Sequence, residues 1–341
     1  MNWGSRIVAE FKPGSSATCK PRLPELTAQL LDQQKEEWPL LSQGYAAFEQ
    51  RQTKTLTDPN DAASCILIQY NPGRIRSTAA QVDKASIESR PCFLCPDNLP
   101  PEEKGIAYGP DLVIACNPFP VLDRHLSVID RQHVPQRIDG RHLDSLLTLS
   151  ADLGEEYITL YNGPECGASA PDHFHLQACA RKGLPIERDF ERARNTSGPE
   201  NYSKISKAVA ISTMAGWRRT VVVFNGVDRE TIVFRMLAVV AALGRVTGKT
   251  DEPMVNIVAV FHSGVWTVFL FPRARHRPES YFKEGNEKMI VSPGAIDMAG
   301  VIVTPRLEDF ERMTAIEVTK VFSEVSLDWA ATHGALASVL D

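Results

Sequence analysis

The stretch His173-Phe174-His175-Leu176-Gln177 places two imidazoles and a carboxamide at intervals of two residues. On an extended strand, side chains two residues apart share one face, so these three would form a row on a single surface. One imidazole can attack phosphorus, and the amide can bind a charged phosphoryl oxygen without acting as an acid. The stretch therefore predicts a strand that carries covalent chemistry at phosphorus.

A loop rich in small residues precedes this strand, within Tyr161 to Asp172. Its small members are Gly163, Gly167, Ala168, Ser169 and Ala170. Small residues let backbone approach a ligand closely, and loop amides can cradle a phosphate. The alternative is two core histidines on a strand beside a turn. Because buried imidazoles find few partners, the H-x-H-x-Q pattern behind such a loop favours a site.

Composition and charge limit the classes of function. The chain has 341 residues, 43% hydrophobic and 23% charged, which is ordinary for a globular protein and long enough for two domains or one duplicated domain. The net charge of −5 argues against binding extended nucleic acid, which usually brings a basic excess. An anionic small substrate stays possible where arginines gather locally.

No targeting or membrane signal stands out. The N-terminal residues lack an apolar run of signal-peptide length. The longest apolar stretch, Met236 to Leu243, is far shorter than the roughly 20 residues of a membrane span. The seven cysteines are an odd number without a disulfide-domain pattern, which agrees with a reducing compartment. We therefore expect a cytoplasmic protein with no membrane partner.

Hydrophobic patterning predicts three regions. Residues 1–60 are expected to form a helical adaptor region, with a helix from Leu23 that stops at Trp38-Pro39. Residues 61–190 alternate strands with one helix, typical of an antiparallel α+β layer rather than a parallel series. The expected strands are 65–70, 111–116, 125–130, 157–161 and 173–179, and the expected helix is 141–153.

The third region, residues 191–341, is expected to have a similar succession of strands with one helix. Strands are expected at 220–225, 256–261 and 265–271, with a helix over 231–246 and a hairpin turn at 262–264. Residues 190–210 are polar and are expected to form a linker or loop. The order of elements indicates a duplication.

Cys92-Phe93-Leu94-Cys95 is a C-x-x-C pair that can bind one tetrahedral Zn²⁺. The other two ligands would come from His133, His173, His125 and Cys116. A redox pair or two unrelated core cysteines are the alternatives. Because Pro91 and Pro96 flank the pair, a loop is favoured over the helix start typical of redox pairs, and zinc is favoured over redox chemistry.

Two groups of arginines are candidates for phosphate binding, since the planar guanidinium suits a pair of phosphate oxygens. Arg74 and Arg76 follow the turn Asn71-Pro72-Gly73, and Arg273 begins the cluster that ends at Arg277. Taken alone, such a group of arginines more often lies on a solvent-exposed edge of a protein than in a binding site. They matter only if they converge on the histidine pair.

Together these residues resemble the transferase branch of the histidine-triad superfamily, which includes galactose-1-phosphate uridylyltransferases, diadenosine tetraphosphate phosphorylases and GDP-hexose phosphorylases. Residues 65–180 carry most of the resemblance. Asn117-Pro118-Phe119-Pro120 through His125 to Ile129 is similar to the family's N-x-F/Y-P … H-x-x-V strand pair. Asn162 to Ser169 is similar to the phosphorylase loop that ends in Gly-Ala-Ser, and His173 to Gln177 to H-x-H-x-Q.

The resemblance implies a histidine-triad-like α+β fold, an antiparallel sheet with helices in two halves, of which residues 191–341 are the degenerate one. It implies that His175 is the nucleophile and that Gln177 binds the transferred phosphoryl group. Ser169 and nearby amides would contact the phosphate beyond the scissile bond, and Arg74 would contact phosphate. Structural Zn²⁺ would be held by Cys92, Cys95, His133 and His173. The full set of expected substrate-binding residues is Arg74, Arg76, Asn117, Asn162, Gly167, Ser169 and Arg273.

The expected function is a nucleotidyltransferase or phosphorylase. It would pass a nucleoside monophosphate group, held on a histidine, from a nucleotide such as a nucleoside diphosphate sugar or dinucleoside polyphosphate to phosphate or a sugar phosphate. The alternatives are a hydrolase with the same histidine chemistry and a non-catalytic, zinc-stabilised nucleotide-binding module. A homodimer is the default assembly.

Overall fold

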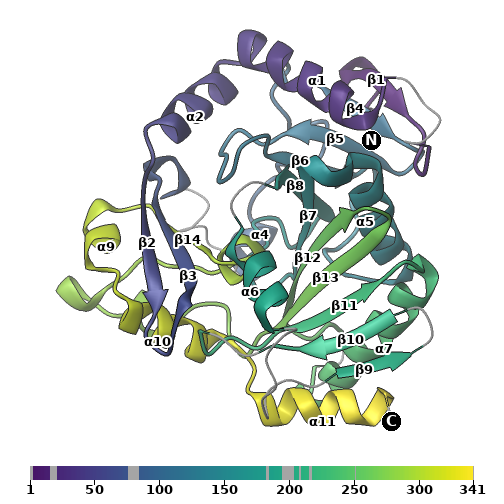
Figure 1. The fold of residues 1–341 in the computed structure, drawn as a ribbon. Coiled ribbons are helices and arrows are strands. Elements are labelled where there is room, and N and C mark those ends of the chain that lie inside the picture. The colour runs from purple at the N-terminus through teal and green to yellow at the C-terminus, as the bar shows by residue number, and fades with distance from the viewer. Residues whose placement is uncertain are drawn as a thin grey trace.

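The computed structural model describes residues 3–15, 21–75, 84–181, 184–193, 203–206, 209–214, 217–249 and 251–340. Their main feature is an 11-stranded sheet that runs across the whole molecule (Figure 1). In spatial order its strands are β1 (Ile7–Phe11), β4 (Gly105–Tyr108), β5 (Leu112–Cys116), β6 (Leu126–Asp130), β8 (His175–Ala180), β7 (Tyr157–Asn162), β12 (Val255–His262), β13 (Val265–Pro272), β11 (Val222–Gly226), β10 (Val209–Thr213) and β9 (Ser203–Ser206).

The strand order is mirrored about the seam between β7 and β12, which pair antiparallel with Leu160 opposite Val258. On one side the order outward is β7, β8, β6, β5, and on the other it is β12, β13, β11, β10. Each side is built from two strands, a helix and two strands along the chain, with α5 (Gly140–Leu153) and α7 (Arg229–Thr247) as the helices. The predicted α+β fold with two duplicated halves is confirmed.

The sheet has a different apolar cluster on each face, as strand alternation requires. Leu176 and Ala178 of β8 pack on one face with α5, α7 and the N-terminal helices α1 (Leu23–Glu37) and α2 (Pro39–Glu49). Cys179 packs on the opposite face, with the C-terminal helices. His175 and Gln177 alternate with Leu176 and Ala178, so they belong to the face away from α5 and α7.

A small second sheet lies over that face. Its strands are β2 (Gln52–Asp58), β3 (Asp61–Tyr70) and β14 (Val301–Thr304), in the order β14-β3-β2. The parallel pairing of β3 with β14 joins a segment from the first third of the chain to one from the last sixth (Figure 1). This sheet carries Arg74, which follows β3 directly.

The remaining elements are short or terminal. The α-helices are α4 (Lys84–Glu88), α6 (Pro185–Ala193), α8 (Ala295–Met298), α9 (Leu307–Arg312), α10 (Ala315–Val325) and α11 (Trp329–Leu340). The 3₁₀ turns are Gly4–Arg6, Pro72–Arg74, Gly154–Glu156, Glu279–Tyr281 and Gly285–Glu287. Among the described helices, none combines the length and apolar character that crossing a bilayer requires.

The N-terminal residues are tied into the main body. The helix expected from Leu23 ends where Trp38 donates its backbone N–H to Gln34, and Pro39 starts a second helix at once. Strand β1 pairs parallel with β4 and so extends the main sheet. The region expected as a linker, 190–210, contains the end of α6, all of β9 and the start of β10; residues 194–202 and 207–208 lie outside the described ranges.

Candidate active site and metal centre

One cavity gathers most of the sequence-predicted residues. It is lined by Arg74, Asn117, Asn162, Gly167, Ser169, His175 and Gln177, contributed by five separate segments of the chain. Strands β6 and β8 supply its floor, because Ser127 pairs with Gln177 and Ile129 with His175, and all four line the cavity. Arg76 lies outside the described residues.

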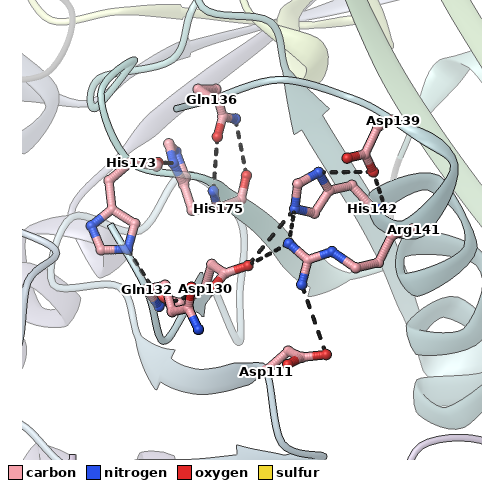
Figure 2. A network of polar contacts seen from close by, with 9 residues as sticks. All are labelled: Asp111, Asp130, Gln132, Gln136, Asp139, Arg141, His142, His173 and His175. Carbon is pink, nitrogen blue, oxygen red and sulfur yellow. Dashed lines mark hydrogen bonds and ion pairs between the residues drawn. The ribbon is translucent and has the colours of Figure 1, made fainter. Parts of the chain in front are cut away.

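His175 is held in one orientation and one tautomer. Its Nδ1 lies 2.9 Å from the carbonyl oxygen of His173, so Nδ1–H donates there and Nε2 keeps its lone pair. Its backbone is bracketed by Gln136, whose Oε1 accepts from the N–H at 2.8 Å and whose Nε2 donates to the carbonyl at 3.0 Å (Figure 2). Burial lowers the pKa of His175 to about 4. The ring is therefore uncharged at neutral pH and keeps a lone pair on Nε2.

Gln177 is oriented by His125. The backbone N–H of Val121 donates to His125 Nδ1 at 3.2 Å, which leaves the proton on Nε2. That Nε2 then donates to Gln177 Oε1 at 2.8 Å. With its oxygen occupied, Gln177 presents its NH₂ group as the free end of the amide, and NH₂ is a donor suited to phosphoryl oxygens. Burial, and then the charge of Arg74, lowers the pKa of His125 to about 3.

The loop before β8 lies against the C-terminal half. Gly167 has φ +110°, and a Cβ there would come within 3.0 Å of Gly294 Cα, so both glycines allow a close backbone approach. Asn162 connects the two sides, since its Oδ1 accepts from Asn256 Nδ2 and from the Ala295 N–H, both at 2.8 Å. The expected substrate role of Asn162 thus coincides with a structural one.

Cationic and polar groups from distant segments line the same cavity. Arg74 donates to the Phe119 carbonyl at 2.8 Å, and burial lowers its pKa to about 10, so it stays charged at neutral pH. His276 and Arg277 both contact Ser292 Oγ, at 3.0 Å each. These groups could bind the anionic part of a substrate. His276, Arg277 and Ser292 were missed as site residues, although the sequence cluster 273–277 pointed to this segment.

The prediction for Arg273 needs correction. Its side chain is 1% exposed and does not line the cavity. The guanidinium donates instead to Asn256 Oδ1 and to the backbone carbonyls of Val325, Pro293, Arg275 and His276. Those bonds engage the planar group on all sides, so Arg273 ties together segments behind the site and cannot bind a substrate.

Cys92, Cys95, His133 and His173 place one donor atom each within 4.8 Å of one another. The Sγ of Cys92 lies 3.3 Å from His173 Nδ1, and the Sγ of Cys95 lies 3.2 Å from His133 Nδ1. Two thiols and two imidazoles at such distances are a donor set suited to a tetrahedral metal ion. The other candidates, His125 and Cys116, do not belong to this cluster.

Neighbouring groups support the metal donors. His173 Nε2 lies 2.8 Å from the carbonyl of Asp130, so Nε2–H donates there and Nδ1 is left for a metal (Figure 2). The Asp130 carboxylate accepts from Arg141 at 3.0 Å and lies 3.7 Å from His142 Nε2. Burial raises the pKa of Asp130, but the hydrogen bonds from His142, Gln132 and Arg141 outweigh it and lower the pKa overall. The residues present fit a metal ion.

Comparisons with known proteins agree with this arrangement. Residues 30–180 match a domain of unknown function, DUF4922, and residues 195–336 match the C-terminal domain of GDPGP1-like proteins. The yeast Ap4A phosphorylase Apa2 in complex with Ap4A is similar at 14% identity and a TM-score of 0.57, over 88% of this chain and 97% of that one. The chain shares the fold of this enzyme.

Two further structures are similar. The same yeast enzyme in complex with AMP matches with 14% identity and a TM-score of 0.56, over 86% of this chain and 97% of that one. An ADP-glucose phosphorylase from Arabidopsis thaliana with bound ADP-glucose has 14% identity and a TM-score of 0.38, over 81% of this chain and 100% of that one. No curated protein is a significant match in sequence. The expected resemblance to histidine-triad transferases is confirmed.

Proposed function

We propose that the protein is a nucleotidyltransferase that works through a nucleotidyl-histidine at His175. The observation that carries the proposal is the state of this side chain: uncharged, with Nδ1–H bound to a carbonyl and Nε2 in a cavity beside a donor amide. Nε2 would attack the α-phosphorus of a nucleotide, forming a P–N bond while the bond to the leaving phosphate oxygen breaks. A phosphate or sugar phosphate oxygen would then attack phosphorus and release Nε2.

The surrounding residues have roles that follow from their contacts. The NH₂ of Gln177 would donate to an oxygen of the transferred phosphoryl group, where charge develops in the transition state. Arg74 and the amides near Gly167 and Ser169 would bind the adjoining phosphates. Gln177 is not ionisable near neutral pH and cannot act as an acid, which favours transfer to an acceptor that needs no proton from the enzyme.

We assign the metal cluster a structural role with zinc as its ion. Cys92, Cys95, His133 and His173 would hold the ion, which supplies a cross-link between the 92–95 turn and the start of β8. The same ligand His173 gives its carbonyl to His175 Nδ1, so fixing one residue fixes the other. Within this scheme residues 61–190 form the catalytic half and 191–341 the degenerate half; β13, the counterpart of β8, carries no histidine.

Covalent labelling tests the proposal. The protein would be incubated with α-³²P-labelled nucleotides and quenched in alkali and in acid, because a phosphoramidate survives alkali and is lost in acid. We expect an acid-labile adduct in the wild type and none in His175→Asn. His262→Asn, at the exposed end of β12, is the matched control and should label normally. Equal labelling of wild type and His175→Asn would refute the mechanism.

Product analysis separates transfer from hydrolysis. A transferase discharges the adduct only when phosphate or a sugar phosphate is supplied, and the nucleotidyl group appears on that acceptor. If discharge in water alone is as fast, and gives free nucleoside monophosphate, the protein is a hydrolase of the same chemical type.

A further inference from the structure

The pairing between β7 and β8 ends just before the site. The antiparallel ladder between these strands ends where Leu160 faces Gln177. In the same register Asn162, the last residue of β7, would face His175, the first residue of β8. The side-chain amide of Gln136 bonds both strands at this place. Its Nε2 donates to the Asn162 carbonyl at 2.9 Å and to the His175 carbonyl at 3.0 Å, and its Oε1 accepts the His175 N–H at 2.8 Å (Figure 2).

The inserted amide holds the two strands apart. A direct ladder would satisfy the same backbone groups without any side chain and would set the strands about 4.8 Å apart. A carboxamide that bonds both backbones from the space between them needs a wider gap. Gln136 is 2% exposed, and both N–H groups and the oxygen of its amide are engaged, which fixes its orientation. The chain therefore uses a buried side chain where backbone pairing was available.

The segment that carries Gln136 is itself fixed. The backbone N–H of Gln136 donates to the Pro171 carbonyl at 3.1 Å. Two residues later, the Ile138 N–H donates to Oε2 of the buried Glu252 at 2.6 Å. An amide on a segment held at both ends gives the backbone of His175 a set position, as a reacting side chain requires of its supporting contacts.

The gap matters because each strand leads to one side of the proposed reaction. Strand β7 continues into the loop whose Gly167 and Ser169 line the cavity, and β8 begins with His175. Reacting atoms have to lie about 3–3.5 Å apart and in line, and a displacement of about 1 Å can slow a reaction about 100-fold. The separation of the strands therefore sets how Nε2 approaches a phosphorus bound at the loop.

We propose that Gln136 is a positioning residue for nucleotidyl transfer: its amide keeps β7 and β8 at the separation that in-line attack by His175 requires. This inference rests on the proposed function, since it assumes that His175 attacks a phosphate bound at the 163–169 loop. Gln136 does not line the cavity. Its replacement should therefore slow the reaction of bound nucleotide and leave the nucleotide Kd nearly unchanged. If the amide only satisfied buried backbone groups, its replacement would lower stability alone.

The variant Gln136→Glu tests the role through a change that depends on pH. The new side chain has the same shape, and its protonated acid can still donate to one carbonyl, whereas the ionised carboxylate donates to neither. Burial beside two carbonyl oxygens raises the pKa of a carboxyl, so the disruptive form appears as the pH rises. We expect the rate of adduct formation at saturating nucleotide, relative to the wild type at the same pH, to fall about 10-fold or more from pH 6 to pH 8.

The ratio to the wild type removes the titrations that both proteins share. The titratable or charged groups around Gln136 are His173, His175, Asp172, Arg137, Tyr161 and Glu252. Among them Glu252 titrates in this range, because burial raises its pKa to about 7. Protonation of the nucleotide phosphates also cancels. Rapid-quench labelling gives the rate per folded, metal-loaded chain, and calorimetry gives the Kd.

Gln34→Glu is the matched control. Gln34 is also fully buried, and its amide bridges the Glu102 carbonyl and the Lys104 N–H at 3.0 and 2.8 Å. This variant should lose stability at pH 8 in the same way, yet its adduct rate per folded chain should follow the wild type. Gln136→Met cannot ionise and keeps the test decisive if the acidic variant unfolds at pH 8. Its adduct rate should lie about 10-fold or more below the wild type at both pH values, with a Kd within about 3-fold.

The outcomes separate this inference from the proposed function. A rate ratio that does not change with pH in Gln136→Glu, or a Gln136→Met chain that labels as fast as the wild type, would overturn the role of Gln136 and leave the covalent mechanism intact. An equal fall in Gln34→Glu, or an effect on the Kd alone, would also overturn it. If the wild type forms no adduct at His175, the proposed function is wrong and the role of Gln136 is wrong with it.

Discussion

Two uncharged side chains, His175 and Gln177, face the cavity with hydrogen-bonding patterns set by their neighbours. The carbonyl of His173 fixes which nitrogen of His175 carries the proton, and His125 fixes which end of the Gln177 amide is free. Both arrangements work only while the imidazoles are neutral. Burial keeps them so, because it is the largest cause of the lowered pKa of each ring.

The lowered pKa of His175 predicts acid sensitivity. Its pKa is about 4 in the folded chain against 6.5 for a free imidazole. Between these values the unfolded chain binds the extra proton, so stability is present above pH 6.5 and is lost as the pH falls towards 4. His175 alone should lower the free energy of unfolding by about 2 kcal/mol at pH 5. Urea denaturation at pH 7 and pH 5 measures this loss.

His125 and His276 should add to that loss, since the pKa of each is lowered to about 3. Adduct formation should not change between pH 6 and pH 8 through ionisation of His175. A free energy of unfolding that is equal at pH 5 and pH 7 would contradict neutral, buried imidazoles.

The contact between His125 and Gln177 predicts a positioning role for His125. In His125→Phe the Gln177 Oε1 loses the N–H that donates to it and the amide can rotate, so its NH₂ is no longer aimed at phosphorus. We expect adduct formation at saturating nucleotide to slow about 10-fold or more, with little change in the nucleotide Kd. Rapid-quench labelling gives the rate, and calorimetry gives the Kd. If the Kd rises and the rate does not change, His125 serves binding instead.

At the scale of elements, local patterns predicted the core of the first half well. The expected strands over 111–116, 125–130 and 157–161 and the expected helix over 141–153 match β5, β6, β7 and α5 within about two residues. The reason is physical: apolar alternation and helical spacing are local, and here they agree with burial. The second half follows the same rule, with a hairpin between β12 and β13 where the sequence predicted it.

The row from His173 to Gln177 was only partly predictable. Strand β8 starts at His175, so His173 lies before it and turns to the metal cluster, while His175 and Gln177 share the cavity face. Alternation predicts which residues share a face but not where a strand begins. The start is set by non-local bonds, such as the Phe174 N–H to the Val134 carbonyl at 2.7 Å.

Arg273 shows the same limit. A cluster of three arginines does not reveal which guanidinium is buried among carbonyls from residues 20 and 52 positions away.

The metal cluster joins the 92–95 turn to the start of β8, which predicts that loss of the ion loosens both. Cys92→Ser should lose the metal and at least about 3 kcal/mol of unfolding free energy, since binding of a structural ion contributes directly to folding. Elemental mass spectrometry and urea denaturation would measure the two effects. Cys65→Ser, a cysteine outside the cluster, is the control and should keep the metal. A wild-type protein purified without any metal would contradict the assignment.

At the scale of the whole molecule, contacts between residues far apart in the sequence hold the C-terminal helices against the main sheet. Arg273 is one of these residues: it bonds β12 through Asn256, the end of α10 through Val325, and the turn before α8 through Pro293. This buried cation therefore joins three segments, and its hydrogen bonds go to neutral amide and carbonyl oxygens rather than to a carboxylate.

We expect Arg273→Met to destabilise the chain by about 3–5 kcal/mol, because several buried acceptors lose their donor at once. Arg275→Met, two residues away and half exposed, should change stability by less than about 0.5 kcal/mol. Thermal and urea unfolding of both variants measure the difference. Similar losses in the two variants would show that the contacts of Arg273 contribute little.

The mirrored strand order has a consequence for binding stoichiometry. Two equal halves would present two equivalent sites, yet the strand opposite β8 reads Val265-Trp266-Thr267-Val268 and offers no imidazole. Titration to saturation should therefore fill one nucleotide per chain with a single affinity. The C-terminal half has no reacting histidine under this proposal. Its residues 276–277, 292 and 294–297 instead line the one cavity where the reaction would take place.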